Sequence, residues 1–140
     1  MRHLLVLLLL AGGAAACEND PASFEENIAG TYTLQTVGGQ PLPAVFFDDP
    51  ATQTRHELTA SELLIGLNLN FREIDTFRIT EGTNITTQVD TFTGTWSFSS
   101  NNALTLTAQD DDGLVTLSGI WDGTHQLTFT SQGVTFVYRR

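Results

Sequence analysis

Two carboxylates two positions apart are the first residues in this sequence whose spacing could do chemistry. Glu73 and Asp75 lie in residues 71–79, a segment that mixes apolar and charged side chains. In an extended strand, residues i and i+2 point to the same face, so the two acids could act as paired carboxylates. Arg72 and Arg78 lie in the same segment. The favoured interpretation is therefore that the acids form solvated ion pairs with these arginines.

The other polar candidates lack a catalytic pattern. His56 and His125 are the histidines beyond His3, and no further histidine or cysteine stands at the spacing of a zinc site. No serine lies in a Gly-x-Ser-x-Gly elbow. Residues 110–113 (Asp-Asp-Asp-Gly) lack the alternation and the closing glutamate of a calcium loop, and Asp-Gly between strands indicates a hairpin turn. We expect no enzymatic activity, no metal and no cofactor.

The first 17 residues have the layout of a secretory signal peptide. Residues 1–3 form a short positively charged start, and residues 4–10 are an unbroken apolar run. Residues 11–16 contain only Ala and Gly, and Cys17, the single cysteine, follows them. This order of regions is typical of an exported protein. The apolar run is too short to span a bilayer, which takes about 20 residues.

The small residues that end on Cys17 resemble the lipobox of bacterial lipoproteins. The resemblance implies that residues 1–16 are removed and that Cys17 is lipidated, for example with palmitate. The protein would then be held to a membrane of the bacterial cell envelope, with its domain in the periplasm or at the outer surface. The alternative is an ordinary cleaved signal peptide in which Cys17 has no role. A single cysteine also excludes an intramolecular disulfide, so the domain depends on its core for stability.

The charge of the chain restricts its partners. Sixteen acidic residues against six basic ones give a formal net charge of −10. Nucleic-acid binding requires clustered Lys and Arg that displace counterions, so nucleic acid is excluded as a partner. Residues 17–27 are predicted to be the lipidated cysteine and a polar tether, which leaves residues 28–140 for a single folded domain.

The domain segment predicts an all-β fold. It is rich in Thr, Val, Phe and Leu, and turns of Gly, Asn and Asp divide it into roughly eight to ten short strands. Short connections favour antiparallel pairing of sequential strands, and closing the sheet removes its exposed edges. We therefore predict an antiparallel up-and-down β-barrel. A barrel of about eight strands is either packed solid or holds one small ligand.

Three local predictions accompany this fold. Separate strands are expected at residues 52–59 and 61–68, and a bulge or bend is expected near residues 73–75. Residues 85–99 are expected to form a long strand or a bent pair, because their apolar side chains change face partway along.

Two segments of the domain share a Gly-Thr-aromatic pattern, GTYTL at residues 30–34 and GTWSF at residues 94–98. The first, with its continuation VGGQPLP, resembles the opening of bacterial lipocalin-like domains. The later hairpins and the C-terminal VTFVYRR are similar to the same group, so the resemblance covers most of residues 28–140. It implies a barrel whose floor is closed by Tyr32. It also implies a lipoprotein that binds a small hydrophobic ligand in the barrel interior.

Aromatic side chains are the candidates for lining such a pocket, because ligand sites are mostly apolar with few polar groups. The predicted ligand-binding residues are Phe92, Trp96, Phe98, Trp121, Phe129 and Phe136. The alternative is that these side chains fill a solid core. The barrel would then be a structural or protein-interaction module of the envelope with no ligand.

Overall fold

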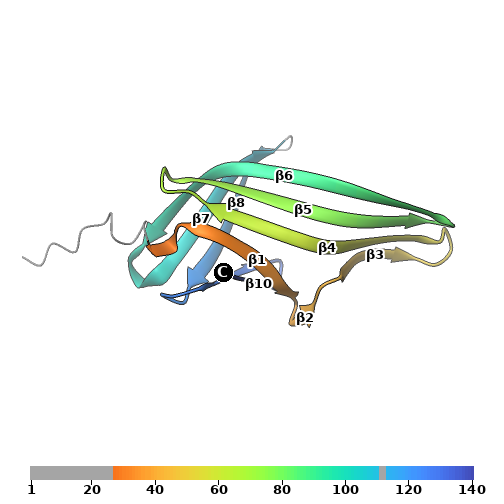
Figure 1. Ribbon diagram of the computed structural model, residues 1–140, viewed down its shortest axis with the longest axis horizontal. Helices are drawn as coiled ribbons and strands as arrows, with labels where there is room; N and C mark the ends of the chain where they lie inside the picture. Colours follow the sequence, from red (N-terminus) through yellow and green to blue (C-terminus); the bar gives the residue numbers. More distant parts are fainter. Residues whose placement is uncertain (1–26, 111–112) are drawn as a thin grey trace, which may run out of the picture.

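The computed structural model describes residues 27–110 and 113–140, so the predicted signal peptide, Cys17 and nearly all of the tether lie outside the described residues. The described part forms one sheet of ten strands (Figure 1). These are β1 (Gly30–Val37), β2 (Gln40–Pro41), β3 (Ala44–Asp49), β4 (Thr54–Ile65), β5 (Asn70–Glu81), β6 (Asn84–Ser99), β7 (Ala103–Asp110), β8 (Gly113–Trp121), β9 (Gln126–Ser131) and β10 (Val134–Arg139), with a short 3-10 turn, η1 (Ser100–Asn102), before β7.

Eight of these described strands close into an antiparallel barrel. Each strand from β4 to β10 pairs with the next one along the chain, β10 pairs with β1, and β1 pairs with β4 to complete the ring. The predicted all-β, up-and-down barrel is therefore confirmed. No helix in the described part of the chain is long and apolar enough to cross a membrane.

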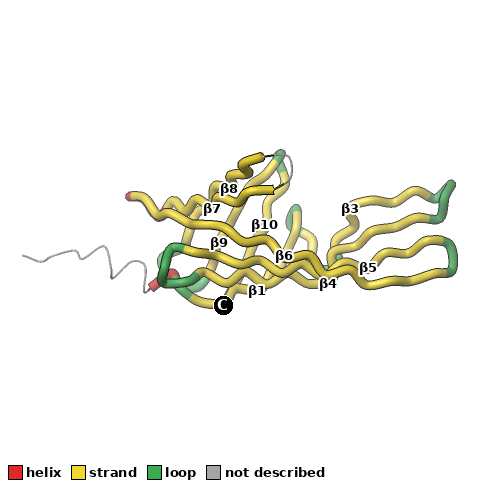
Figure 2. Tube along the Cα trace, turned by 90° about the horizontal axis from the view of Figure 1, so that it is seen from above, coloured by secondary structure: helices red, strands yellow, loops and turns green. Residues whose placement is uncertain are grey.

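The start of β4, the end of β5 and the start of β6 extend beyond the ring, and β3 pairs alongside them. The start of β1 pairs with the end of β4, but the end of β1 pairs with β2, and the start of β4 pairs with β3. We call the extension the arm: it consists of β3, residues 54–58 of β4, residues 76–81 of β5 and residues 84–90 of β6. It projects from the barrel as a four-stranded sheet (Figures 1 and 2).

The strand predictions around the arm are partly wrong. Residues 54–65 form one strand, β4, whose register against β5 shifts between Leu58 and Ala60. This bulge changes the phase of the apolar side chains, and the sequence pattern therefore looked like two strands. The bulge expected near residues 73–75 is absent, because β5 pairs with β6 without a shift from Asn70 to Glu81.

The long-strand prediction for residues 85–99 is confirmed by β6, which runs without a break for 16 residues. Its change of face has a simple cause. Ile85 and Val89 lie on the outer face of the arm, where β6 pairs with β5 alone, whereas Trp96 points into the barrel, where β6 also pairs with β7.

The core fills one end of the barrel, which we call the closed end. Tyr32, fully buried, lies there as the floor residue that the resemblance implied, and its hydroxyl donates a hydrogen bond of 2.7 Å to the carbonyl of Ile28. Arg140 donates hydrogen bonds to the carbonyls of Asn27, Ala29 and Thr124, and its guanidinium lies 5.3 Å from the centre of the Tyr32 ring. The opposite end, from which the arm projects, we call the mouth.

Candidate ligand-binding site

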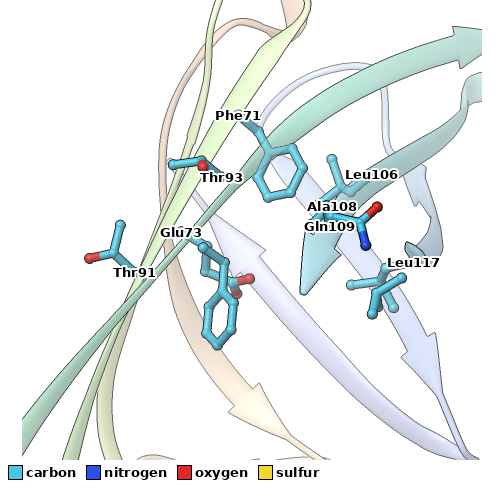
Figure 3. A pocket seen from close by; sticks show the side chains of 10 residues that line it. Phe71, Glu73, Thr91, Thr93, Leu106, Ala108, Gln109 and Leu117 are labelled. Atoms are coloured by element: carbon cyan, nitrogen blue, oxygen red, sulfur yellow. The ribbon is translucent and has the colours of Figure 1, made fainter. Parts of the chain in front are cut away.

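Two adjoining cavities occupy the half of the barrel nearest the mouth. The first has a volume of about 300 Å³ and the second about 310 Å³. They share Glu73, Val115 and Leu117, so they are two parts of one hollow. The first is lined by Phe71, Glu73, Thr91, Phe92, Thr93, Leu106, Ala108, Gln109, Val115 and Leu117 (Figure 3). The second is lined by Phe46, Leu58, Glu73, Asp75, Phe77, Val115, Thr116, Leu117, Ser131, Phe136 and Tyr138.

The hollow exists because the barrel wall parts between β6 and β7. The two strands are paired from Ser99↔Ala103 to Gly94↔Ala108, and beyond that point β6 follows β5 into the arm. The first cavity lies in this gap, with residues 91–93 on one side and the β7–β8 hairpin on the other (Figure 3). The open half of the barrel is therefore accessible from the side as well as from the mouth.

Gly94 sits at the point where the strands part. A Cβ at this position would lie 2.1 Å from the carbonyl oxygen of Thr107 and 2.7 Å from a ring carbon of Phe71. Both distances are far below van der Waals contact, so only glycine allows the Phe71 ring and β7 to approach β6 this closely. Phe71 in turn forms the base of the first cavity.

A polar cluster lies at the junction of the two cavities. The Tyr138 hydroxyl donates a hydrogen bond to the carboxylate of Glu73, and the Ser61 hydroxyl lies 3.2 Å from the Tyr138 oxygen and 3.4 Å from Oε1 of Glu73. Burial raises the pKa of Glu73, and it also raises the pKa of Tyr138. This part of the cluster satisfies itself without a ligand.

Asp75 differs from Glu73, because its Oδ1 atom is buried and has no hydrogen-bond partner in the described part of the chain. Burial raises the pKa of Asp75, a hydrogen bond from Ser61 to the carboxyl opposes this rise, and the charge of Asp90, directly opposite on β6, adds to it. Asp75 lines the second cavity. A buried acceptor without a donor is costly, so the fold leaves this carboxyl incompletely satisfied at the edge of the second cavity.

The structure changes the interpretation of these acids. Glu73 and Asp75 share one face of β5, as their spacing predicted, but that face points into the barrel. The ion pairs expected with Arg72 and Arg78 are therefore wrong. Arg78 lies on the outer face, where its Nε donates a 2.7 Å hydrogen bond to Glu57, and that contact lowers the pKa of the Glu57 carboxyl. Even-numbered residues of β5 point away from the interior, so Arg72 cannot reach the two acids.

The six predicted ligand-binding aromatics are divided between two places. Phe92 lines the first cavity and Phe136 the second. Trp96, Trp121 and Phe129 are buried in the core of the closed end, and Phe98 packs against that core. Lining residues outside the predicted set include Val115 and Leu117, and their alternation with Trp121 along β8 was the sequence signal that could have identified them.

The other polar candidates lie away from the hollow. The His56 ring packs 5.4 Å from the Phe47 ring in the arm, and His125 lies in the loop between β8 and β9. The predicted turn at residues 110–113 falls partly outside the described residues. Among those that are described, no group of three or more His, Cys, Asp or Glu could hold a metal ion. No family model matches the sequence, and neither a curated protein nor a solved structure matches it.

Proposed function

We propose that this chain is a lipid-anchored protein of the bacterial cell envelope and that its barrel binds a small, mainly apolar molecule near the mouth. The observation that carries the proposal is the pair of adjoining cavities, each about 300 Å³, lined mostly by apolar side chains around one polar cluster. Ligand sites are usually hollows of about 300–1,000 Å³ with this distribution of groups. The anchor rests on the lipobox-like residues that precede Cys17.

The geometry suggests how such a molecule is held. Its apolar part packs against Phe71, Phe92 and Leu117, which line the first cavity. Polar groups of the ligand face the carboxyl of Asp75, which lines the second cavity. The core of the closed end is already filled, so binding is confined to the half of the barrel near the mouth.

A neutral hydrophobic dye tests this proposal. The probe is N-phenyl-1-naphthylamine, because the net charge of −10 and the interior carboxylates would repel an anionic dye. The dye is titrated into the full chain carrying Cys17→Ser, and this protein is purified without detergent. We expect saturable fluorescence, and a Leu117→Trp change that fills the shared part of the hollow should weaken dye binding at least tenfold. The matched control is Ile120→Trp on the same strand, where the side chain is 61% exposed and binding should not change.

Native mass spectrometry of the same protein provides a second measurement. An adduct that organic solvent removes, or uptake from an envelope lipid extract, would support binding and give the mass of the molecule. If the dye does not bind, or if both tryptophan variants bind it equally, the binding proposal fails. The alternative, a packed structural or protein-interaction module without ligand, would then stand.

The anchor has a separate test. The wild-type chain is expected in the membrane fraction, with residues 1–16 absent and the added mass of acyl chains on Cys17. Cys17→Ser removes the acceptor thiol and should release the protein into the soluble fraction. An unmodified intact mass in the membrane fraction, or unchanged attachment of the variant, would contradict lipidation.

A further inference from the structure

The two edges of the arm differ in how they are protected from pairing with another chain. The β3 edge carries Asp48 and Asp49, contains a bulge between Val45 and Phe47, and follows the proline-containing residues 41–43. Charges, bulges and prolines are the features by which proteins block an exposed edge strand. The β3 edge is therefore a poor template for a further strand.

The β6 edge has none of these features. Residues 84–90 pair with β5 on one side, and the pairing of β6 with β7 begins only at Gly94. The segment contains no proline, lysine or bulge, and Asp90 is its single charged residue. Figure 1 shows this part of β6 along one border of the arm, away from β7 and β8. Its outward backbone N–H and C=O groups form a regular row, and none of the described strands pairs with them.

The outer face of the same segment is apolar. Ile85 is 65% exposed and Val89 is 59% exposed, and Thr87 lies between them on that face. β-branched residues of this kind gain most from a cross-strand neighbour. Within the described part of the arm, no strand on the free side of β6 supplies one.

We propose that residues 84–90 of β6 pair antiparallel with the same residues of a second copy, about a two-fold axis at Thr87. This register places Ile85 opposite Val89 of the other copy, twice by symmetry, on the outer face. It places Asp90 opposite Asn84, so no like charges meet. An axis at Gln88 or Val89 would instead set Ile85 against a threonine, at position 91 or 93. The two arms become one eight-stranded sheet with an isologous interface.

The charges of the chain favour a second copy over a different partner. Two molecules of net charge −10 repel each other over most of their surfaces, and this edge is nearly uncharged. A basic partner, which the net charge would attract elsewhere, gains little at this edge, because the outer-face carboxylate of Glu57 is already paired with Arg55 and Arg78. A nearly uncharged edge that is complementary to itself fits another copy of the chain.

Cysteine crosslinking in the full chain carrying Cys17→Ser tests the register. Thr87→Cys places two thiols at the axis, where the Cα atoms are within the range of about 4.4–6.8 Å that a disulfide requires. Thr91→Cys, on the same face of the same strand, places them about 27 Å apart. Under mild oxidation we expect a covalent dimer with Thr87→Cys at least tenfold more abundant than with Thr91→Cys. Equal crosslinking at the two positions would overturn the proposal.

Sedimentation over a concentration series tests the interface independently. The Cys17→Ser chain should reach the mass of a dimer, and Ile85→Lys together with Val89→Lys should weaken the dimer at least tenfold. Both side chains are more than half exposed, so their replacement should not affect folding. Ile120→Lys, similarly exposed on β8, should leave the dimer intact. A monomer at every concentration, a dimer that the lysines do not weaken, or a different protein bound at this edge would overturn the proposal.

Discussion

Asp75 carries its carboxyl inside the barrel, where no described residue donates a hydrogen bond to Oδ1. Burial raises its pKa, so the folded protein retains the proton at pH values at which the unfolded chain has lost it. The free energy of unfolding therefore falls as the pH rises from the unfolded pKa, about 4, through the raised folded value. We expect Asp75→Asn, which removes the charge, to raise the free energy of unfolding at pH 7 by about 1 kcal/mol.

Urea unfolding between pH 4 and pH 8 measures this effect. The difference between Asp75→Asn and the wild type should shrink toward zero as the pH falls, because the wild-type carboxyl is then also neutral. The control is Asp48→Asn at a half-exposed ion pair with Arg55, where the change should be within about 0.5 kcal/mol. A gain that persists at pH 4, or no gain at pH 7, would show that burial of the charge is not the cause.

At the residue scale, the sequence predicted that Glu73 and Asp75 share a face but not which face. Phe71 and Phe77 lie on the same face of β5 as the two acids, and Ile74 lies on the opposite face. Both faces carry apolar side chains, so the sequence pattern allows either face to be the buried one. The nearby arginines favoured a solvated surface. The deciding contacts come from Ser61 and Tyr138, and Tyr138 lies 65 positions from Glu73. No local pattern carries that information.

At the scale of the elements, Gly94 controls how closely β6, β7 and the Phe71 ring approach one another. We expect Gly94→Ala to destabilise the fold by about 1–3 kcal/mol, because its Cβ would meet the Thr107 carbonyl at 2.1 Å and strand backbone cannot move freely. Thermal or urea unfolding measures the loss. Thr95→Ala, the exposed neighbour on the outer face, should change stability by less than about 0.5 kcal/mol. Equal effects of the two variants would contradict the close-packing explanation.

The strands themselves were largely predictable, whereas the arm was not. The phase change between Ile85 and Trp96 was visible in the sequence, and it marks the point where β6 enters the barrel wall. The first half of β6 has no described strand beside it on one side. This follows from the positions of β7 and β1, which are set by the closure of the whole ring. The division of the aromatics between core and hollow depends on the same geometry.

At the scale of the whole molecule, Arg140 joins segments that are distant in the sequence. Its hydrogen bonds reach the carbonyls of Asn27, Ala29 and Thr124, and it lies over the Tyr32 ring. We expect Arg140→Ala to lower the free energy of unfolding by about 2 kcal/mol, because it removes three charge-assisted hydrogen bonds and the contact with the Tyr32 ring. Arg140→Lys should recover only part of the loss, since an ammonium lacks the planar fork of donors.

Arg139→Ala is the matched control for this prediction. Arg139 is exposed and donates one hydrogen bond, of 3.0 Å, to the side chain of Gln126. Its removal should change stability by about 0.5 kcal/mol or less. If the two alanine variants lose equal stability in urea unfolding, Arg140 does not have the closing role that its contacts indicate.

Asn27 and Arg140 both lie at the closed end, whereas the hollow and the arm lie at the other. A tether joined at residue 27 would therefore enter the barrel at the end opposite the mouth. When the anchored barrel turns its mouth toward water, an apolar molecule that originates in the membrane must desorb before it can be captured. Its loading rate would then be set by its escape from the lipid phase and would become independent of protein concentration once capture is fast.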